Sequence, residues 1–571
     1  MRGLCRDMSA DHRSPQSEGV LPLAVNLFFL LVGFATLFFL LTGGIPLLQW
    51  GGENSLDVAV AKKFSMKAVR ASVLIFFTVT TFFAWKYRSR FENLWIVRVA
   101  RKIASFPLRY SVGTLFLIYS AMMILIGFER HAALDTRAFD LGIFAQALWN
   151  TTQGDFLYSS LKDGICLLGD HVSPILVLIA PLYAVVSDPR ILLVIQPLAT
   201  ASCMFAIAWI ARDRFKDKSL VLVFVLMFFF YMPARAALRE DFHPEVLAEI
   251  FIFLAFIALE RGRLGWFWLC VVPVMGAKEN FLGITFFMGA YGAIFKKRWF
   301  SGFVLMLVSA VLFLFEIRWL VPFLSHAPYF YRGTYEQFSS EPLNRFFAIM
   351  SDGGRWQYGL KVYASFLFLP FFNLQTFFLT LPVFLQNFLS ANPTMRSLNY
   401  HYSSGLTPFL FISAIYGVKT LGDRWSYAKK HQGALVLVMF VVVLTQSAPP
   451  EYFYFWRCRM RQTPHAVYVR ERLNSVGPGV SVLSHNNFIP QMINRKYIYQ
   501  LDYNASPTKG ELAKKLDVDY VIFDETFWEP NSAPPAVALA ELQALGYVIK
   551  EEKDGFYILA KRPAAVLSSV S

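Results

Sequence analysis

Charge is scarce in this sequence. Only 16% of its 571 residues are Asp, Glu, Lys or Arg, whereas 56% are hydrophobic and 17% are aromatic. An average soluble domain carries about 25% charged residues. The low charge therefore excludes an ordinary water-soluble enzyme and indicates that lipid surrounds most of the chain.

Cysteine is also scarce, and the cysteines follow no functional spacing. None of the five forms a Cys-x-x-Cys pair: Cys5, Cys166, Cys203, Cys270 and Cys458. Neither a cysteine zinc site nor a disulfide framework is indicated. The sequence has no Gly-rich phosphate loop and no signature of RNA or DNA binding, so the net charge of +15 indicates basic cytoplasmic loops and not a nucleic-acid partner.

Apolar segments of membrane-spanning length recur along most of the chain. A spanning helix needs roughly 20 mostly apolar residues. The pattern predicts a polytopic α-helical membrane protein with about 13 transmembrane helices. The expected spans are Leu21–Gly43, Ala68–Trp85, Tyr110–Phe128, Ile191–Ala211, Leu220–Pro233, Val246–Leu259, Leu264–Gly276, Phe281–Phe295, Phe300–Phe323, Leu406–Val418 and Gly433–Thr445, with Leu360–Leu389 as two short spans or one broken hairpin.

Basic residues in the short loops set the expected orientation, because Lys and Arg resist translocation. The loop Arg88–Arg109 is strongly basic and is placed in the cytoplasm. The basic loop Arg212–Lys218 reaches the same side if Ser173–Ser187 is a re-entrant or interfacial helix. The N-terminus is then inside and the C-terminal part outside, in a cytoplasmic (inner) membrane.

The composition changes after Pro449. Strands are expected at Val480–Ser484, Tyr497–Leu501, Tyr520–Asp524, Tyr547–Lys550 and Phe556–Ala560, with helices at Lys509–Leu516 and Ala536–Leu545. We predict three parts. Residues 1–109 are an N-terminal cytoplasmic tail with two extra transmembrane helices, residues 110–447 are a transmembrane core, and residues 448–571 are a small extracytoplasmic α/β domain.

Polar residues suited to chemistry gather on the expected external side. A charge at the bilayer centre costs about 2.5–3.5 kcal/mol on insertion scales, so acids beside membrane helices indicate a site. The candidates are Asp140, Asp170, His171, Arg239, Asp241, His243, Glu245, Lys278, Glu279 and His401, with Tyr329 and Tyr331 at a substrate entry.

The first external loop leaves two interpretations open for its acids. Asp140 precedes a short amphipathic helix, where its carboxylate either caps the helix or acts as a general base toward a hydroxyl. Asp170 or Ser173 is placed to cap the helix that begins at Pro174. Capping does not explain His171, because a cap does not require an imidazole.

The segment Arg235–Glu245 is the densest polar cluster. Asp241, His243 and Glu245 stand at alternate positions, which suit a divalent metal, while the arginines suit a phosphate. The alternative is a solvated loop with ion pairs. No metal ligand is assigned, and a divalent cation is left open as a cofactor.

Two further candidate groups lie at helix ends. Lys278 and Glu279 sit between hydrophobic helices, where they form either an internal ion pair or a contact with a donor phosphate. His401 precedes a span, and an aromatic belt accounts for the tyrosines beside it.

Several candidates stand in longer strings: Phe139-Asp140-Leu-Gly-Ile-Phe-Ala-Gln-Ala-Leu-Trp149, Gly169-Asp170-His171-Val-Ser-Pro174, Asp241-Phe-His243-Pro244, Lys278-Glu279, and His401-Tyr402 followed by Pro408-Phe-Leu-Phe. These strings resemble an uncharacterised bacterial family of multi-pass membrane proteins. That family is catalogued as a domain of unknown function and grouped with the GT-C glycosyltransferases. The resemblance covers residues 110–560.

The resemblance implies a GT-C-like fold and an inverting transfer of a sugar from a polyprenyl-phosphate donor to an unknown acceptor outside the cytoplasm. It implies Asp140 as the base and Asp241 as a second-loop acid, with Lys278 or Arg239 at the donor phosphate. Ala145 and Asn280 depart from the family's pattern, because each stands where an acid is expected.

Two other functions are compatible with the sequence. A transporter or flippase of a lipid-linked or polar solute also needs many spans and polar residues in broken helices. Its expected signature is an internal repeat with charges near the midplane, and no such repeat is evident. A non-catalytic receptor or membrane scaffold would use the C-terminal domain.

Overall fold

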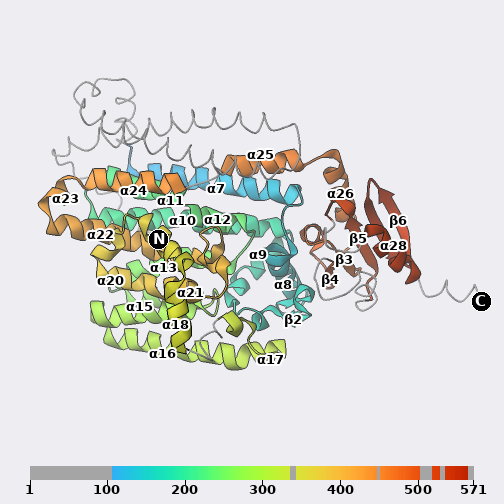
Figure 1. Ribbon diagram of the computed structural model, residues 1–571, viewed down its shortest axis with the longest axis horizontal. Helices are drawn as coiled ribbons and strands as arrows, with labels where there is room; N and C mark the ends of the chain where they lie inside the picture. Colours follow the sequence, from blue (N-terminus) through green and yellow to red (C-terminus); the bar gives the residue numbers. More distant parts are fainter. Residues whose placement is uncertain (1–105, 335–341, 447–450, 502–516, 528–533, 563–571) are drawn as a thin grey trace, which may run out of the picture.

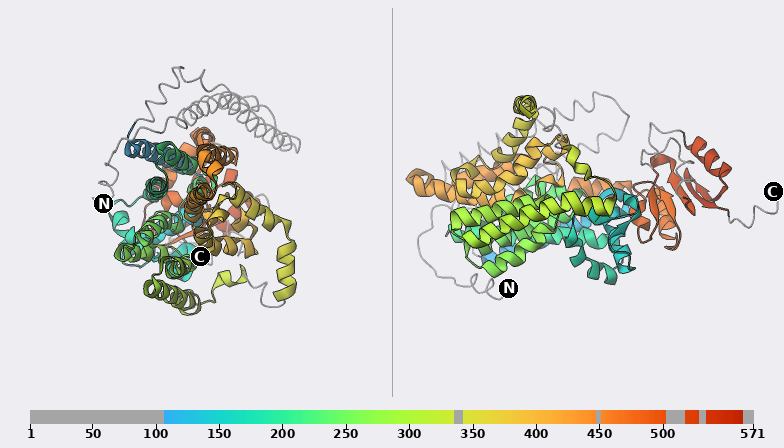
Figure 2. Two further views of the ribbon diagram at one scale, coloured as in Figure 1. Left: turned by 90° about the vertical axis from the view of Figure 1, so that its left-hand side faces the viewer. Right: turned by 90° about the horizontal axis from the view of Figure 1, so that it is seen from below.

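The computed structural model describes residues 106–334, 342–446, 451–501, 517–527 and 534–562 (Figure 1). The expected tail and its two extra spans fall on residues 1–105, outside the described residues, and so does the expected helix Lys509–Leu516. The described chain forms a bundle of apolar helices with a five-stranded sheet beyond one end of the bundle (Figure 2).

The helices of the bundle run along one common direction (Figures 1 and 2). They are α7 Leu108–Ala132, α10 Leu192–Arg214, α11 Lys218–Phe230, α12 Met232–Arg239, α13 Pro244–Glu260, α14 Leu264–Met275, α15 Phe281–Lys296, α16 Trp299–Phe315, α17 Val321–Ser325, α22 Thr407–Arg424 and α24 Gln432–Gln446.

Within the described residues, four helical stretches are long and apolar enough to cross a membrane: Leu108–Ala132, Pro189–Arg214, Lys218–Arg239 and Trp299–Ser325. The protein is therefore a multi-pass membrane protein, while the expected total of about 13 spans stays a prediction.

Short helical elements lie between α17 and α22, and those within Leu360–Leu389 fold back on one another, while the number of spans that they form stays a prediction. The elements are α18 Pro342–Ser351, α19 Gly353–Ala364, η9 Leu369–Phe372, α20 Leu374–Phe377, η10 Phe378–Thr380 and α21 Leu381–Leu389. The chain reverses at Leu367 and Phe368, which both have positive φ angles. Asn373, just after the turn, donates to Thr420 of α22 at 3.0 Å and so anchors this segment.

Aromatic side chains mark both ends of the long helical stretch that contains α16. Trp299 and Phe300 at its start are 65% and 85% exposed, and Trp319 and Phe323 near its end are 70% and 76% exposed. Aromatic residues favour the two interfaces of a bilayer. This flank of α16 therefore faces lipid along the length of a membrane span.

A partly buried charge cluster lies at the end of the bundle farthest from the sheet. Glu260, the last residue of α13, accepts hydrogen bonds from Tyr291 and Tyr416 at 2.8 Å and pairs with Arg214 at 3.3 Å and Lys296 at 2.6 Å. The 17 residues of α13 put this cluster about 25 Å from the helix's first turn. The cluster joins α10, α13, α15 and α22 at the end that carries the basic loops.

The first loop after α7 lies at the opposite end of the bundle. It contains η1 Ala138–Gly142, α8 Ile143–Thr152, β1 Tyr158–Ser159, η2 Ser160–Lys162, β2 Ile165–Cys166, η3 Leu167–Gly169, η4 Pro174–Leu178, α9 Ala180–Val185 and η5 Pro189–Ile191. The segment expected to be re-entrant or interfacial forms η4 and α9. At 5 and 6 residues, both are too short to cross a bilayer.

The C-terminal sheet has the strand order β4-β3-β5-β7-β6. Its strands are β3 Val482–Ser484, β4 Ile498–Gln500, β5 Tyr520–Asp524, β6 Tyr547–Lys553 and β7 Phe556–Lys561, with helices α25 Glu451–Arg461, α26 Pro464–Asn474 and α28 Pro535–Ala544. β3 pairs in parallel with β4 and β5, and β7 pairs antiparallel with β5 and β6. Asp554 and Gly555 close the last hairpin at φ angles of 50° and 81°, which Asp-Gly favours.

Replacing Glu260 with Gln is expected to lower the free energy of unfolding by about 2 kcal/mol, because it removes the carboxylate that pairs with Lys296 and leaves Arg214 with Asp213 alone, at 3.7 Å, in a partly buried cluster. Asp423→Asn is the matched control at the same end, since the Lys419–Asp423 pair is exposed and is worth less than about 1 kcal/mol. Thermal unfolding in detergent measures both variants. Equal, small effects of the two substitutions would contradict the role given to Glu260.

Candidate active site

A cavity of about 1280 Å³ lies at the sheet end of the bundle, between the first loop and the ends of the helices. It exceeds the ~300–1,000 Å³ of an ordinary ligand pocket. One part of its wall is charged. The other part follows α15, α16 and α21 and is mainly apolar, lined by Phe286, Ser309, Ala310, Phe313, Ile317, Pro382 and Val383. The cavity thus joins a charged chamber to a groove along a lipid-facing helix.

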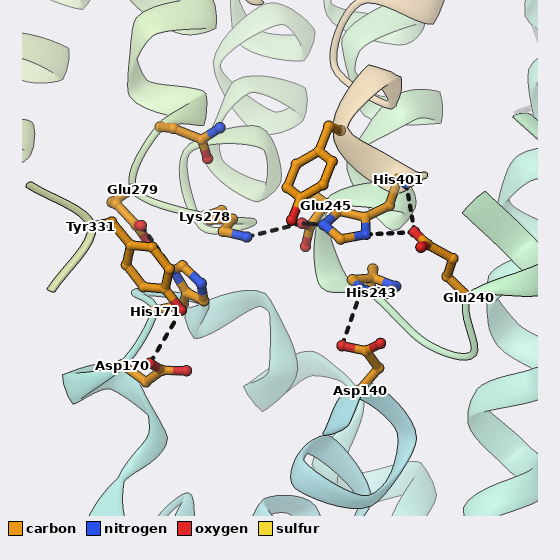
Figure 3. Close-up of polar contacts among 12 residues, drawn as sticks. Asp140, Asp170, His171, Glu240, His243, Glu245, Lys278, Glu279, Tyr331 and His401 are labelled. Carbon is orange, nitrogen blue, oxygen red and sulfur yellow. Dashed lines mark hydrogen bonds and ion pairs between the residues drawn. The ribbon is translucent and has the colours of Figure 1, made fainter. Parts of the chain in front are cut away.

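Eight of the ten candidate residues from the sequence line this cavity: Asp140, Asp170, His171, His243, Glu245, Lys278, Glu279 and His401. Tyr329 and Tyr331 line it as well. The close-up shows the charged side chains converging from the first loop, the start of α13, the α14–α15 connection and the segment before α22 (Figure 3). Arg239 and Asp241 do not belong to the cavity wall.

Asp140 does not cap a helix, so that interpretation is wrong. Helix α8 begins at Ile143, and its N-cap residue Gly142 offers no side-chain hydrogen bond. Asp140 itself has φ 86° and ψ −86°, a strained conformation for a residue with a side chain. The turn points the carboxylate across the cavity, where Oδ1 lies 3.3 Å from Nε2 of His243 (Figure 3).

Asp140 and His243 form an ion pair in which His243 is buried and Asp140 is exposed to the cavity. Burial disfavours a charged imidazole, but the charge and hydrogen bond of Asp140 outweigh it and raise the pKa of His243 to about 9. Burial is likewise outweighed at Asp140, whose pKa is lowered by His243. The Asp140 side chain is 45% exposed toward the cavity, whereas that of His243 is 5% exposed. Asp140 is therefore an ionised carboxylate that can accept a proton from a bound hydroxyl.

A second histidine stacks on the first. The rings of His243 and His401 lie 3.7 Å apart and within 22° of parallel. Nδ1 of His401 is 2.8 Å from Glu240, which also accepts the backbone N–H of His401 at 2.7 Å. Burial and the charge of His243 hold the pKa of His401 well below its usual value, and burial raises the pKa of Glu240 to about 7. Only one ring of the pair carries charge near neutral pH.

The residues that come together as possible metal ligands differ from those that the sequence suggested. The ligand atoms of Glu240, His243 and His401 lie within 4.8 Å of one another, and this set replaces the expected Asp241, His243 and Glu245. A ring nitrogen binds a metal in the ring plane at about 2.0–2.1 Å. Two stacked, nearly parallel rings cannot both do so toward one ion. As folded, the three residues do not fit a metal centre.

Lys278 forms an internal ion pair, but not with its neighbour in the sequence. Its Nζ lies 3.1 Å from Oε1 of Glu245, and this charge together with that of Glu279 outweighs burial and raises the pKa of Lys278. Glu279 instead accepts from Tyr329 at 2.7 Å and contacts Nδ1 of His171 at 2.9 Å. The charge of Lys278 is thus largely neutralised within the protein.

Asp170 and His171 hold the segment after α17 against the first loop. The His171 and Tyr331 rings stack at 4.2 Å, and the Tyr331 hydroxyl donates to Asp170 at 3.4 Å (Figure 3). Lys162 pairs with the other oxygen of Asp170 at 2.8 Å. Neither Asp170 nor Ser173 provides a side-chain cap for η4, so the capping interpretation is wrong here too.

Asp241 and Arg239 lie behind the cavity wall. Asp241 is 3% exposed, pairs with Arg130 at 2.8 Å and accepts the backbone N–H of Arg137 at 2.9 Å. Arg239 lies over the ring of Tyr454 at 4.7 Å. Asp241 therefore holds the segment before Asp140 through its hydrogen bond to Arg137, and Arg239 packs against α25.

Sequence reasoning missed Arg318, and it placed Glu240 in the densest polar cluster without giving it a role. Arg318 lines the cavity from η6 Glu316–Leu320, a π-helical turn between α16 and α17. A lone arginine in the expected span Phe300–Phe323 was the available signal, because charge within a span is rare and usually functional. π-Turns are also frequent at functional sites.

The two departures from the family pattern lie in different surroundings. Ala145 is fully buried in the apolar cluster around α8 and does not reach the cavity. Asn280 lines the cavity and donates to Gln386 at 3.1 Å. An acid at position 145 would not face the site in this fold.

These features define a helical membrane protein with one large, charged cavity at the end of its bundle. The chain belongs to the family described as predicted membrane protein (DUF2079), whose model matches residues 130–558. This confirms the resemblance to an uncharacterised multi-pass family. No curated protein matches the chain.

The solved structures that are similar in fold include two of one protein. They are ArnT from Cupriavidus metallidurans bound to undecaprenyl phosphate, with a TM-score of 0.47 and 11% identity, and the same protein in the apo state, with a TM-score of 0.45 and 12% identity. Each comparison covers 78% of this chain and 98% of ArnT. A likeness at this level says nothing of the chemistry of the site.

The effect of His243→Gln on stability is expected to depend on pH. Protonated His243 stabilises the folded state fully below pH 6.5, and this contribution is lost as the pH rises through about 9. The shift from 6.5 to about 9 corresponds to about 3 kcal/mol. Thermal unfolding of both proteins in detergent from pH 6 to 9.5 should show a difference that shrinks with pH. A difference that grows with pH would contradict the ion pair.

Proposed function

We propose that this protein is a membrane glycosyltransferase that moves a sugar from a polyprenyl-phosphate donor to an acceptor. The observation that supports this most is the continuity of the cavity, which joins a charged chamber to an apolar groove along α16. An amphiphile with an anionic, sugar-bearing head and a long chain matches that shape. The GT-C grouping implied by the sequence motifs points to the same class of donor.

The reaction needs a base, and Asp140 is placed to be one. Its carboxylate takes the proton of the acceptor hydroxyl while that oxygen attacks the anomeric carbon. The bond from this carbon to the phosphate oxygen breaks, and the lipid phosphate leaves with the electron pair. Attack opposite the leaving group inverts the anomeric centre. His243 orients Asp140 and keeps it ionised.

The leaving phosphate needs a cation, and most cavity cations already have an anion. In the described part of the chain the paired cavity cations are Lys162 with Asp170, His243 with Asp140 and Lys278 with Glu245. The other cavity histidines also contact carboxylates, His171 at Glu279 and His401 at Glu240 and Glu245. Arg318 also lines the cavity, and no described acidic group pairs with it. We assign the donor phosphate to Arg318. Lys278 is a second cation of the same cavity wall, and Arg239 is excluded because it does not line the cavity.

The orientation follows from charge. The basic loops and the Glu260 cluster lie at one end of the bundle, and the cavity lies at the other. Because basic loops stay in the cytoplasm, the cavity and the C-terminal domain are external and the acceptor is extracytoplasmic. With this orientation the N-terminus is expected on the cytoplasmic side of the inner membrane.

The transporter and scaffold alternatives are less well supported. A transporter must open its site to both ends, whereas Glu260 ties four helices together at the far end. A scaffold does not require a strained, cavity-facing carboxylate such as Asp140.

Asp140→Asn is expected to abolish release of labelled sugar from polyprenyl-phosphate sugars, by at least about 100-fold, because an amide cannot act as a base. Purified protein in detergent is assayed with a panel of donors. Asp163→Asn is the matched control: Asp163 is an exposed acid of the same loop, and Asn tolerates its φ of 56°.

Equal turnover by wild type and Asp140→Asn would remove Asp140 from the mechanism. If the wild type turns over none of the donors but still binds the lipid, the transporter or scaffold alternatives would be favoured.

Arg318→Gln is expected to weaken binding of polyprenyl phosphate about 10- to 100-fold, because a charge-assisted contact contributes about 1.5–3 kcal/mol. Binding of the uncharged polyprenol should change less than twofold. Arg298→Gln, at the other end of α16, is the control and should bind both lipids as wild type does. Parallel losses for both lipids would mean that Arg318 shapes the groove and does not bind the phosphate.

A further inference from the structure

The C-terminal sheet has a topological switch point, the place at which open α/β sheets bind ligands. β3 pairs in parallel with β4 on one side and with β5 on the other, so the order of the strands reverses at β3: the chain adds β4 on one side and then crosses to the opposite side for β5. In open α/β sheets, ligands bind at such a switch point, outside the carboxyl ends of the strands. Here those ends carry Ser484 and Asp524, followed by the segment 485–488 and by η14 Glu525–Phe527.

The first loop of the membrane core packs against these strand ends, where a ligand would otherwise bind. The backbone N–H of Ala138 donates to both the backbone oxygen and Oδ1 of Asn486, at 2.9 and 2.8 Å. Asn487 donates to the carbonyl of Leu134 at 2.7 Å. Phe488 and Ile489 share one apolar cluster with Leu141 and other residues of this loop.

Contacts of the preceding residue, His485, with strand β5 fix the position of Asn486. Nε2 of His485, the preceding residue, lies 3.1 Å from the backbone oxygen of Asp524. The fully buried side chain of Asp524 accepts from Thr526 at 2.8 Å and contacts His465 at 2.6 Å. Asn486 therefore presents its two oxygens from a fixed support.

We propose that the C-terminal domain is a positioning element for Asp140, with Asn486 as its point of contact. Ala138 precedes Asp140 by two residues, and Asp140 has the strained φ of 86° that aims its carboxylate at His243. Such a conformation persists only when its surroundings hold it. Asn486 anchors the start of the turn, and Asp241 holds Arg137 beside it. This inference rests on the proposed function for its catalytic part only.

The test combines hydrogen–deuterium exchange with sugar-release kinetics on the full-length protein. Asn486→Ala removes one acceptor, while Asn486→Asp keeps an oxygen in its place. Asn494→Ala is the matched control, because Asn494 also joins the domain to the core. Its partners, Tyr183 and Ser187, lie far from Asp140 in the chain, whereas the partner of Asn486 lies two residues from it.

Asn486→Ala should exchange several-fold faster in peptides that span residues 136–142 and should lower kcat about five- to tenfold with KM within twofold. Asn486→Asp should restore both values, and Asn494→Ala should change neither. A positioning residue moves kcat in this way, whereas a general loss of stability would also appear in the control.

Unchanged exchange in Asn486→Ala would overturn the inference, and so would faster exchange with wild-type kcat. If wild type turns over no donor, the proposed function has failed. Exchange alone then decides the positioning: faster exchange at 136–142 supports it, and unchanged exchange overturns it.

Discussion

Hydrocarbon does not solvate an unpaired charge, and this constraint arranges the whole protein. Two clusters of charged side chains lie at the two ends of the helices, and most of their members are paired. At one end Glu260 joins four helices through two hydroxyls and two cations. At the other end Asp140, Glu245 and their partners line the cavity. Helix α13 connects the two clusters, and its apolar middle keeps them apart.

Because the cavity charges are so largely paired, the site is selective about what it can accept. Lys278 and His243 already face carboxylates, so a second anion gains little from either of them. Arg318 differs, since it lines the cavity from η6, directly after α16, and no described acidic group pairs with it. A phosphate there keeps its lipid chain in the apolar groove and directs its sugar toward Asp140. Pairing thus fixes both the position and the direction of a donor.

The sequence indicated which residues meet, but not how they pair. Apolar runs and acids beside helix ends placed eight candidates on one cavity wall, and the strand Tyr520–Asp524 has the predicted limits. The turn at Asp140 was not predictable, because it depends on Asn486, 348 residues after Ala138. The sequence suggested an ion pair between Lys278 and its neighbour Glu279, whereas in the structure Lys278 pairs with Glu245. Arg318 was hidden within a long apolar run.

The account joins three separate parts of the chain in one reaction: the first loop supplies the base, α16 supplies the groove and the phosphate contact, and the C-terminal sheet holds the base in position. The most direct test is an experimental structure of the full-length protein in a lipid nanodisc with a polyprenyl-phosphate sugar. The account predicts the phosphate beside Arg318, the chain along α16 and the anomeric carbon facing Asp140. A lipid that binds outside this cavity, with the charged chamber empty, would contradict it.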